Sequence, residues 1–357
     1  MVLDLGFIDE TQNLLLESRF FPSKVGGKPA WLDLKFIPSS DQLICDACGM
    51  PNSFLCQLYC PLDEKESAFH RTIFIFLCLS KNCFQTNSNK NFIVLRSQLP
   101  LKNSYYPDTP PFLDKNWRPD ISCSSHGVNL CFICGIRGII SCDDRCKQLF
   151  CSSYHKQIHN DNQNFKFDQK NKDRPTLLPE FGLSIESVDD QNNADAESES
   201  ESDDENVENT KQNNLDYMNL LQFCAAHDLI DDNSFDEICK RISETAHDKV
   251  FLNFKSQIAM HPTQIIRYAR NTEPLWLSKE NIPICDSIPS CEYCGSSRQF
   301  EFQILPQILN YLNLDRDNNY IPGILDWGTL AIYTCRNNCD EGSAYKKEFL
   351  WKQDLIS

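Results

Sequence analysis

The sequence predicts an α+β protein that is mainly antiparallel β, with two related β-rich halves stapled by zinc, an inserted cysteine-rich segment and an acidic disordered linker. Three observations support this prediction. A pattern that contains cysteines occurs twice, near either end of the 357-residue chain. The chain has 19 cysteines, and its first residues lack a secretory signal, which favours metal binding over disulfides. One segment is rich in acids and poor in apolar residues, so it cannot bury enough surface to fold.

The repeated pattern begins with a proline–tryptophan motif. Pro29, Trp31 and Pro38 are matched in type and spacing by Pro274, Trp276 and Pro283. Both copies continue with a C-x-x-C-G turn, then an apolar β-type run, and then a second pair of cysteines. Chance would not readily place these features twice in the same order, so the sequence predicts an internal duplication.

Most of each half is predicted to form strands. The runs 72–79 and 329–334 are rich in β-branched and aromatic residues, and residues 300–304 alternate apolar with polar side chains. Apolar residues near helical spacing predict a helix from about Phe235 to Met260. Thr263, which follows Pro262, is expected to cap a second short helix through Tyr268.

The predicted organisation has four parts: an N-terminal β-rich half (1–115), a cysteine-rich insert (123–165), an acidic linker (184–214), and a helix followed by the C-terminal β-rich half (232–357). The net charge is −16, and Glu186 to Glu208 alone carries eleven acids. An acidic chain favours basic partners. It gives no sign of the basic surface that a protein needs to bind nucleic acid. The linker is equally consistent with a plain solvated spacer. No run approaches the ~18 apolar residues of a membrane span.

Each half carries a candidate zinc site. Structural zinc takes four ligands in a tetrahedron, and a C-x-x-C turn brings two thiolates to one ion. The glycine that follows each turn admits a backbone conformation that a side chain would obstruct. The alternative, free buried thiols, fits single cysteines better than a duplicated set of four. The predicted zinc ligands are Cys45, Cys48, Cys78 and Cys83 in the first half, and Cys291, Cys294, Cys335 and Cys339 in the second.

The insert resembles a MYND-type zinc finger, in which the ligands interleave over two ions. That resemblance implies one ion held by Cys131, Cys134, Cys151 and His155, and a second held by Cys142, Cys146 and His159. Two features depart from the family pattern: three residues rather than two separate Cys142 from Cys146, and the final cysteine is missing. Cys123, His126 or a water molecule is left as the fourth ligand of the second ion.

Several longer motifs lie along nearly the whole chain. They include Phe69-His-Arg71, Gln98-Leu-Pro100, Arg267-Tyr-x-Arg270, Asp326-Trp-Gly328 and Trp351-Lys-Gln-Asp354. Together these motifs resemble the programmed cell death protein 2 family. The resemblance implies a dedicated chaperone for one small-subunit ribosomal protein (number five in universal naming, number two in eukaryotic naming), which supports small-subunit biogenesis and ribosomal RNA maturation. We therefore expect a basic ribosomal partner, zinc as the cofactor, and a cytoplasmic and nuclear location.

Other functional classes fit less well. Val25 to Lys28 lacks the spacing of a phosphate loop, no HExxH motif occurs, and zinc sites saturated with cysteine leave no open position for water, so we expect no enzyme. A direct role in RNA processing would need a basic and aromatic face. The main alternative is an adaptor whose finger binds proline-containing peptides of transcriptional regulators. For a chaperone, we expect the client at exposed sheet edges or where the two halves meet.

Overall fold

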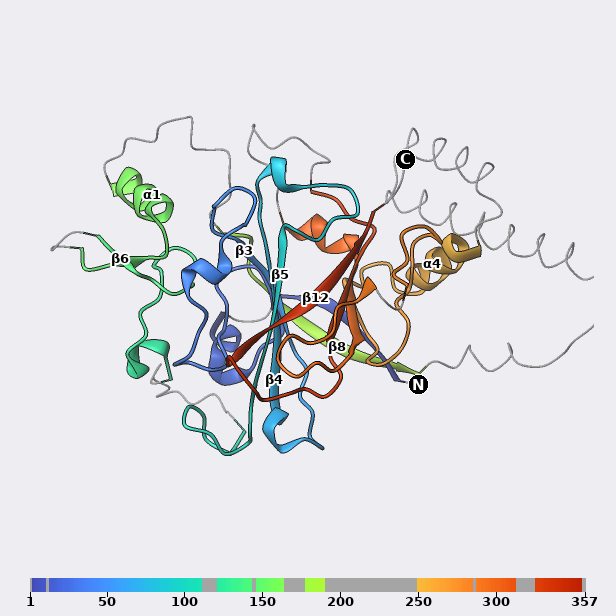
Figure 1. Ribbon diagram of the computed structural model, residues 1–357, viewed down its shortest axis with the longest axis horizontal. Helices are drawn as coiled ribbons and strands as arrows, with labels where there is room; N and C mark the ends of the chain where they lie inside the picture. Colours follow the sequence, from blue (N-terminus) through green and yellow to red (C-terminus); the bar gives the residue numbers. More distant parts are fainter. Residues whose placement is uncertain are drawn as a thin grey trace, which may run out of the picture.

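The computed structural model describes residues 2–10, 13–110, 121–142, 146–163, 177–189, 249–284, 287–312 and 325–354. Within these residues, ten strands form one closed barrel, in the order β1-β8-β2-β3-β4-β5-β12-β11-β10-β9 (Figure 1). Every neighbouring pair is antiparallel. The prediction of a mainly antiparallel β protein is therefore confirmed, and strands from both predicted halves enter the same sheet.

The elements follow the chain in three groups. The N-terminal strands are β1 (Val2–Asp9), β2 (Lys24–Val25), β3 (Ser53–Tyr59), β4 (His70–Leu77) and β5 (Phe92–Leu99). The insert contributes β6 (Ile140–Ser141), β7 (Leu149–Phe150) and helix α1 (Ser153–Gln163). The rest are β8 (Phe181–Asp189), helix α4 (Lys249–Met260), β9 (Ile266–Tyr268), β10 (Arg298–Ile304), β11 (Thr329–Cys335) and β12 (Tyr345–Gln353). Short 3₁₀ helices lie at Asn13–Leu16, Ser18–Phe20, Ser40–Leu43, Glu66–Ala68, Lys81–Cys83, Cys123–His126 and Pro306–Tyr311.

Two four-stranded meanders make up most of the barrel. The N-terminal meander is β2-β3-β4-β5 and the C-terminal meander is β9-β10-β11-β12. They meet directly where β5 pairs with β12. On the opposite side, the antiparallel ribbon of β1 and β8 joins β9 to β2. The barrel therefore closes only when segments from across the chain come together.

The two meanders share local details. The ladder of β3 with β4 shifts register at Leu55, and the ladder of β10 with β11 shifts at Glu301. The amide of Gln57 exchanges two hydrogen bonds with the backbone of Ala30, at 2.9 and 3.3 Å. The amide of Gln303 does the same with the backbone of Leu275, at 2.6 and 3.0 Å. Each amide anchors the segment that carries a tryptophan, Trp31 in one meander and Trp276 in the other.

Side chains alternate between the barrel interior and its outer surface, as strand geometry requires. The inward side chains of β4 and β11 fill the interior of the barrel. The outward side chains of β4 pack under Trp31, and those of β11 pack under Trp276. The inward set is Ile73, Ile75, Leu77, Leu330 and Ile332, and the outward set is Phe74, Phe76, Ala331 and Tyr333.

Two predicted elements need correction. The short helix expected from Thr263 to Tyr268 is wrong, because residues 266–268 form strand β9. Ile266 pairs with Gly6 on one side and Ile304 on the other, and this non-local pairing outweighs the local helix signal. The predicted disordered linker is wrong at residues 184–189, which form the end of β8 against β1.

Other predictions lie partly outside the described residues. The expected helix from Phe235 to Met260 is confirmed from Lys249 onward as α4, and its earlier part is not described. Residues 190–214 of the predicted linker also lie outside the described residues. In the part of the chain that the structure describes, no helix combines the length and apolar character needed to span a membrane.

Candidate metal centres

The four predicted cysteines of the first half gather at one end of β3 and β4. Their sulfur atoms all lie within 4.8 Å of one another. The Sγ atoms of Cys45 and Cys83 are 3.7 Å apart, and those of Cys48 and Cys78 are 3.5 Å apart. Thiolates bound at ~2.3 Å around a tetrahedral zinc would be about 3.8 Å apart. A disulfide would need ~2.05 Å, so the spacing fits a shared metal ion and not disulfides.

The four cysteines of the second half repeat this arrangement. The Sγ atoms of Cys291 and Cys339 are 3.7 Å apart, and those of Cys294 and Cys335 are 3.6 Å apart. All four sulfur atoms again lie within 4.8 Å of one another. The same sequence positions are therefore in contact in both centres. Zinc is the metal that such a closed set of four thiolates would hold.

A common turn positions the first ligand pair in each half and in the insert. In all three, the glycine after C-x-x-C lies in the left-handed region, and its N–H donates to the carbonyl of the first cysteine. A side chain would strain this conformation, so the expectation for Gly49 and Gly295 is confirmed, and Gly135 of the insert adopts the same conformation. The φ angles are +67° at Gly49, +72° at Gly135 and +72° at Gly295.

The first ligand set of the insert also comes together. Sγ of Cys134 is 3.5 Å from Sγ of Cys151, and Nδ1 of His155 lies 3.1 Å from Sγ of Cys151 and 3.6 Å from Sγ of Cys131. Cys151 directly follows β7, and His155 lies in the first turn of α1. These four ligand atoms fit one zinc ion with bonds of ~2.3 Å to sulfur and ~2.0 Å to nitrogen.

The second set of the insert has three members among the described residues. Cys142, Cys146 and His159 place their ligand atoms within 4.8 Å of one another, and Sγ of Cys146 is 3.2 Å from Nε2 of His159. Neither Cys123 nor His126 joins them. Cys123 packs in the buried cluster around Trp31, and the ring of His126 lies against Tyr105. Of the three expected fourth ligands, Cys123 and His126 are therefore not part of this set.

The insert packs against the barrel instead of standing apart from it. The indole N–H of Trp31 donates to the carbonyl of Gly135 at 2.8 Å, and Nζ of Lys28 donates to the carbonyl of Phe132 at 2.7 Å. A Cβ at Gly135 would lie 2.8 Å from Cβ of Lys28, so this contact needs glycine. Trp31 is only 1% exposed and shares its buried cluster with ligands of the insert.

Two cysteines without a predicted ligand role are buried thiols. Cys56 and Cys60 lie in the barrel interior. Burial raises the pKa of the Cys60 thiol to about 12, despite the opposing charge of Arg71. Both thiols are therefore protonated at neutral pH. Cys224, Cys239 and Cys285 lie outside the described residues.

A buried ion pair between the meanders was not predicted from the sequence. Arg71 on β4 makes two hydrogen bonds, of 2.8 and 2.9 Å, to the carboxylate of Glu301 on β10, and both side chains are fully buried. Burial acts to raise the pKa of the Glu301 carboxyl, but the charge of Arg71 holds it below its usual value. The motif Phe69-His-Arg71 drew attention to the arginine, whereas no local signal identifies its partner.

A cleft of about 910 Å³ lies where the insert meets both ends of the chain. Its walls include Phe36 from the N-terminal part, Arg137 from the insert and Lys346 from β12. This is the junction at which a client groove was expected. Lys35 also lines it, and Asp340 is its one acidic lining residue among those described, so the charge of the cleft does not suit a cationic segment.

Comparisons with known proteins cover nearly the whole chain. A family model for the N-terminal domain of programmed cell death protein 2 matches residues 2–112, and one for its C-terminal putative domain matches residues 248–354. Programmed cell death protein 2 of Rattus norvegicus is 37% identical over 367 residues, covering 99% of this chain and 97% of the relative. Programmed cell death protein 2-like of Mus musculus is 24% identical over 361 residues, covering 90% and 86%.

A shorter match involves a protein of Schizosaccharomyces pombe named probable 20S rRNA accumulation protein 4. It is 31% identical over 108 residues, covering 28% of this chain and 25% of the relative. No solved structure matches this chain.

Proposed function

Because this chain belongs to the programmed cell death protein 2 family, we propose that it is a non-catalytic, zinc-bound chaperone for a basic protein of the small ribosomal subunit. The family resemblance of the sequence points to ribosomal protein five in universal naming as the client. The partial relative named for 20S rRNA accumulation supports a role in ribosome biogenesis, and the net charge of −16 suits a basic client. The chaperone would act in both cytoplasm and nucleus.

The proposal includes the origin and the metal content of the fold. The two meanders are the products of a duplication, supported by the matched bulges, amide anchors and cysteine centres described above. Their two centres each hold one zinc ion. The insert is a MYND-type finger, supported by the interleaved order of its two ligand sets.

We propose that the client binds at the open edge of β8. A closed barrel leaves few unpaired strand edges, but β2 pairs with β8 only at Phe181 and Gly182. From Ser184 to Asp189, no described strand pairs with the side of β8 that faces away from β1. Ile185 is 40% exposed on this stretch, and Glu186 beside it begins the run of eleven acids. An extended cationic segment of the client would add to this edge, where backbone hydrogen bonds supply affinity and the acids supply selectivity.

Affinity purification of the full-length protein with mass spectrometry tests the function. One dominant small-subunit ribosomal protein is expected. Recovery of many nuclear regulators, with no ribosomal protein enriched, would favour an adaptor instead.

A proline at Ile185 tests the location. The N–H of Leu183 donates to the carbonyl of Ser23 on the β2 side, so alternation directs the N–H of Ile185 to the same open edge. Ile185→Pro removes that donor and leaves the pairing with β1 intact. We expect Ile185→Pro to lose the client and Ile185→Ala to keep it. Equal capture by both variants would exclude this edge, and would leave the chaperone function standing.

The cleft supports a second candidate function. Phe36 is 60% exposed at its wall, beside residues of the insert, and proline-rich peptides bind to aromatic surfaces of this kind. An adaptor for proline-containing peptides would use it. A peptide array offered to the full-length protein and to Phe36→Ala tests this function, because the adaptor alone predicts retained peptides that the variant loses.

A further inference from the structure

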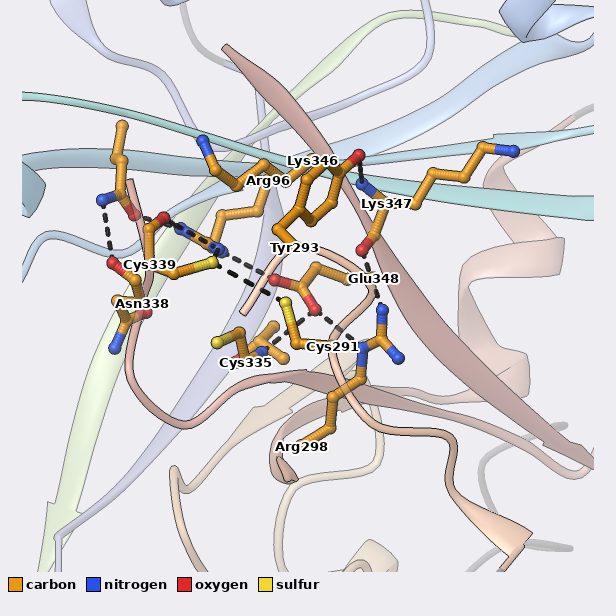
Figure 2. Close-up of polar contacts among 12 residues, drawn as sticks. Arg96, Cys291, Tyr293, Arg298, Cys335, Asn338, Cys339, Lys346, Lys347 and Glu348 are labelled. Carbon is orange, nitrogen blue, oxygen red and sulfur yellow. Dashed lines mark hydrogen bonds and ion pairs between the residues drawn. The ribbon is translucent and has the colours of Figure 1, made fainter. Parts of the chain in front are cut away.

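The cysteine centre of the C-terminal meander is contacted by an arginine from the N-terminal meander (Figure 2). Arg96 on β5 is fully buried, and its Nε donates to Oε1 of Glu348 at 2.7 Å. Both of its terminal nitrogens lie 3.4 Å from the carbonyl oxygen of Cys339, and Nη2 lies 3.8 Å from the sulfur of the same residue. A predicted zinc ligand of one meander thus receives hydrogen bonds from the other.

Glu348 extends this contact to a second ligand. Its Oε2 accepts a hydrogen bond of 3.0 Å from the backbone N–H of Cys335 and another of 3.0 Å from Nε of Arg298 on β10. The carboxylate therefore lies between Arg96 and the backbone of Cys335 (Figure 2). Groups of this kind, one shell outside the ligands, orient the ligands and tune their affinity for metal.

The N-terminal meander also holds the loop between these two ligands. Nζ of Lys65 donates to the carbonyls of Asn337 and Asn338, at 2.8 and 2.6 Å, and Nε2 of Gln98 donates to the carbonyl of Asn338 at 3.0 Å. The direction of these carbonyls depends on the loop, which begins and ends at the ligands Cys335 and Cys339. A metal bound to both cysteines would fix the acceptors that Lys65 and Gln98 use.

The centre of the N-terminal meander has a different environment. The sulfur of Cys78 accepts from the N–H of Ser80, in its own loop, at 3.4 Å. Lys352 on β12 matches Arg96 in the repeat, because each lies thirteen residues after the last cysteine of its own set, Cys339 and Cys83. It contacts Asp354 at 2.6 Å and the carbonyl of Gln85 at 3.4 Å, outside the ligand loop.

We propose that Arg96 is a positioning residue of the C-terminal zinc centre, and that this centre joins the two meanders. Zinc bound there orders the 335–340 loop, and the loop then presents a carbonyl and a thiolate to Arg96. Four thiolates around one Zn²⁺ leave about two negative charges, and the guanidinium of Arg96 offsets part of this charge. Metal retention at this centre therefore depends on the N-terminal meander, whereas retention at the N-terminal centre does not depend on Arg96.

Cysteine alkylation, followed peptide by peptide with mass spectrometry, tests this dependence on the zinc-loaded full-length protein. Arg96→Met is compared with Arg71→Met, a matched control. Arg71 is also fully buried, also pairs with a glutamate of the other meander, and also contacts a cysteine, Cys60, but that cysteine is no metal ligand. Each variant leaves its glutamate a second arginine, Arg298 for Glu348 and Arg270 for Glu301.

The expected result is selective. With a chelator present, Arg96→Met should speed alkylation of Cys335 and Cys339 about 10- to 100-fold, the usual effect of losing an outer-shell group, and leave Cys78 and Cys83 unchanged. Arg71→Met should not distinguish the two centres. Equal acceleration at both centres in Arg96→Met, or the same selectivity in Arg71→Met, would overturn the proposal.

A second measurement uses the wild-type protein and does not require a stable variant. Chelator is added in steps, and hydrogen exchange is followed by peptide. Loss of metal from the C-terminal centre should release protection on β5 and around Lys65 in the same step as the 335–340 loop. Release of that loop with β5 still fully protected would contradict a joint between the meanders.

Discussion

Glu301 occupies the bulge of β10 at the position where β3 carries Leu55 in its own bulge. A buried carboxylate there is stable only because its oxygens are fully used. Besides Arg71, it accepts hydrogen bonds from the hydroxyls of Tyr268 at 2.8 Å and Thr334 at 2.5 Å. Removing charges from water is costly, so such a pair adds less to stability than its close contacts suggest. Replacing only one member of the pair is nevertheless strongly destabilising, because the other charge then stays buried without a partner.

We therefore expect Glu301→Gln to destabilise the protein by about 3–5 kcal/mol, because Arg71 stays buried with its charge unbalanced. Urea unfolding measures the change. The double variant Arg71→Met with Glu301→Leu should recover most of the loss, since leucine already fills the matching bulge. A double variant as unstable as the single one would contradict this explanation.

The C-x-x-C-G turns were predictable at the residue level because their information is local. Ligand spacing and the glycine requirement both follow from a few neighbouring residues, and the structure has the turns at Gly49 and Gly295 in the expected conformation. The Arg71–Glu301 and Arg96–Glu348 pairs were not predictable. Their partners are separated by 230 and 252 residues and are brought together only by barrel closure.

At the scale of elements, strand pairing decided where prediction succeeded. The apolar runs of β4 and β11 were found because both faces of those strands are covered, which selects β-branched and aromatic residues. Strand β9 was missed, because its three residues form a strand only through pairing with β1 and β10. The end of β8 was missed for a similar reason, since its partner β1 lies at the start of the chain, far from β8 in the sequence.

Zinc bound at the cysteine centres would hold these elements together, so losing one ligand should unfold more than its own loop. Binding of a structural zinc is worth on the order of 10 kcal/mol, comparable to the whole stability of a domain. We expect Cys45→Ser or Cys291→Ser to abolish cooperative thermal unfolding. Cys56→Ser, at a buried thiol outside the ligand sets, should keep it.

Metal analysis provides the complementary prediction. Protein purified without chelator should contain at least three zinc ions per chain, one for each complete set of four ligands. Inductively coupled plasma mass spectrometry measures this ratio. Protein that is folded and free of zinc would exclude a structural role for the metal.

Deletion of residues 123–159 tests how far the insert is separable. We expect the barrel to keep both of its cysteine centres, because each takes its ligands from one meander. Trp31 would lose the surface that now leaves it 1% exposed, so tryptophan fluorescence should shift to longer wavelength. Adding Trp31→Phe to the deletion should abolish the shift, and adding Trp276→Phe should not. Loss of zinc from both meanders would show that the insert is needed to fold the barrel.

At the scale of the whole molecule, two surfaces differ in charge and in position: the edge of β8 and the cleft beside the insert. Among the described residues, β5 pairs with β12 on one side of the barrel, and no strand covers the acidic edge of β8 on the other. The cleft at the junction with the insert has a cationic lining and an exposed phenylalanine. The sequence predicted an acidic protein with a concave junction, and could not predict that the concave surface would have the opposite charge. Under the proposed chaperone function, this separation favours the β8 edge over the cleft as the place where a basic client would bind.

Depletion of the protein from cells tests the central claim most directly, by sucrose-gradient measurement of the ratio of mature small to large ribosomal subunits. A chaperone for a small-subunit protein predicts that this ratio falls, while large subunits are spared and the client becomes insoluble. Wild-type protein should restore the ratio, and Ile185→Pro should not. An unchanged ratio with the client still soluble would contradict the chaperone function and favour the adaptor.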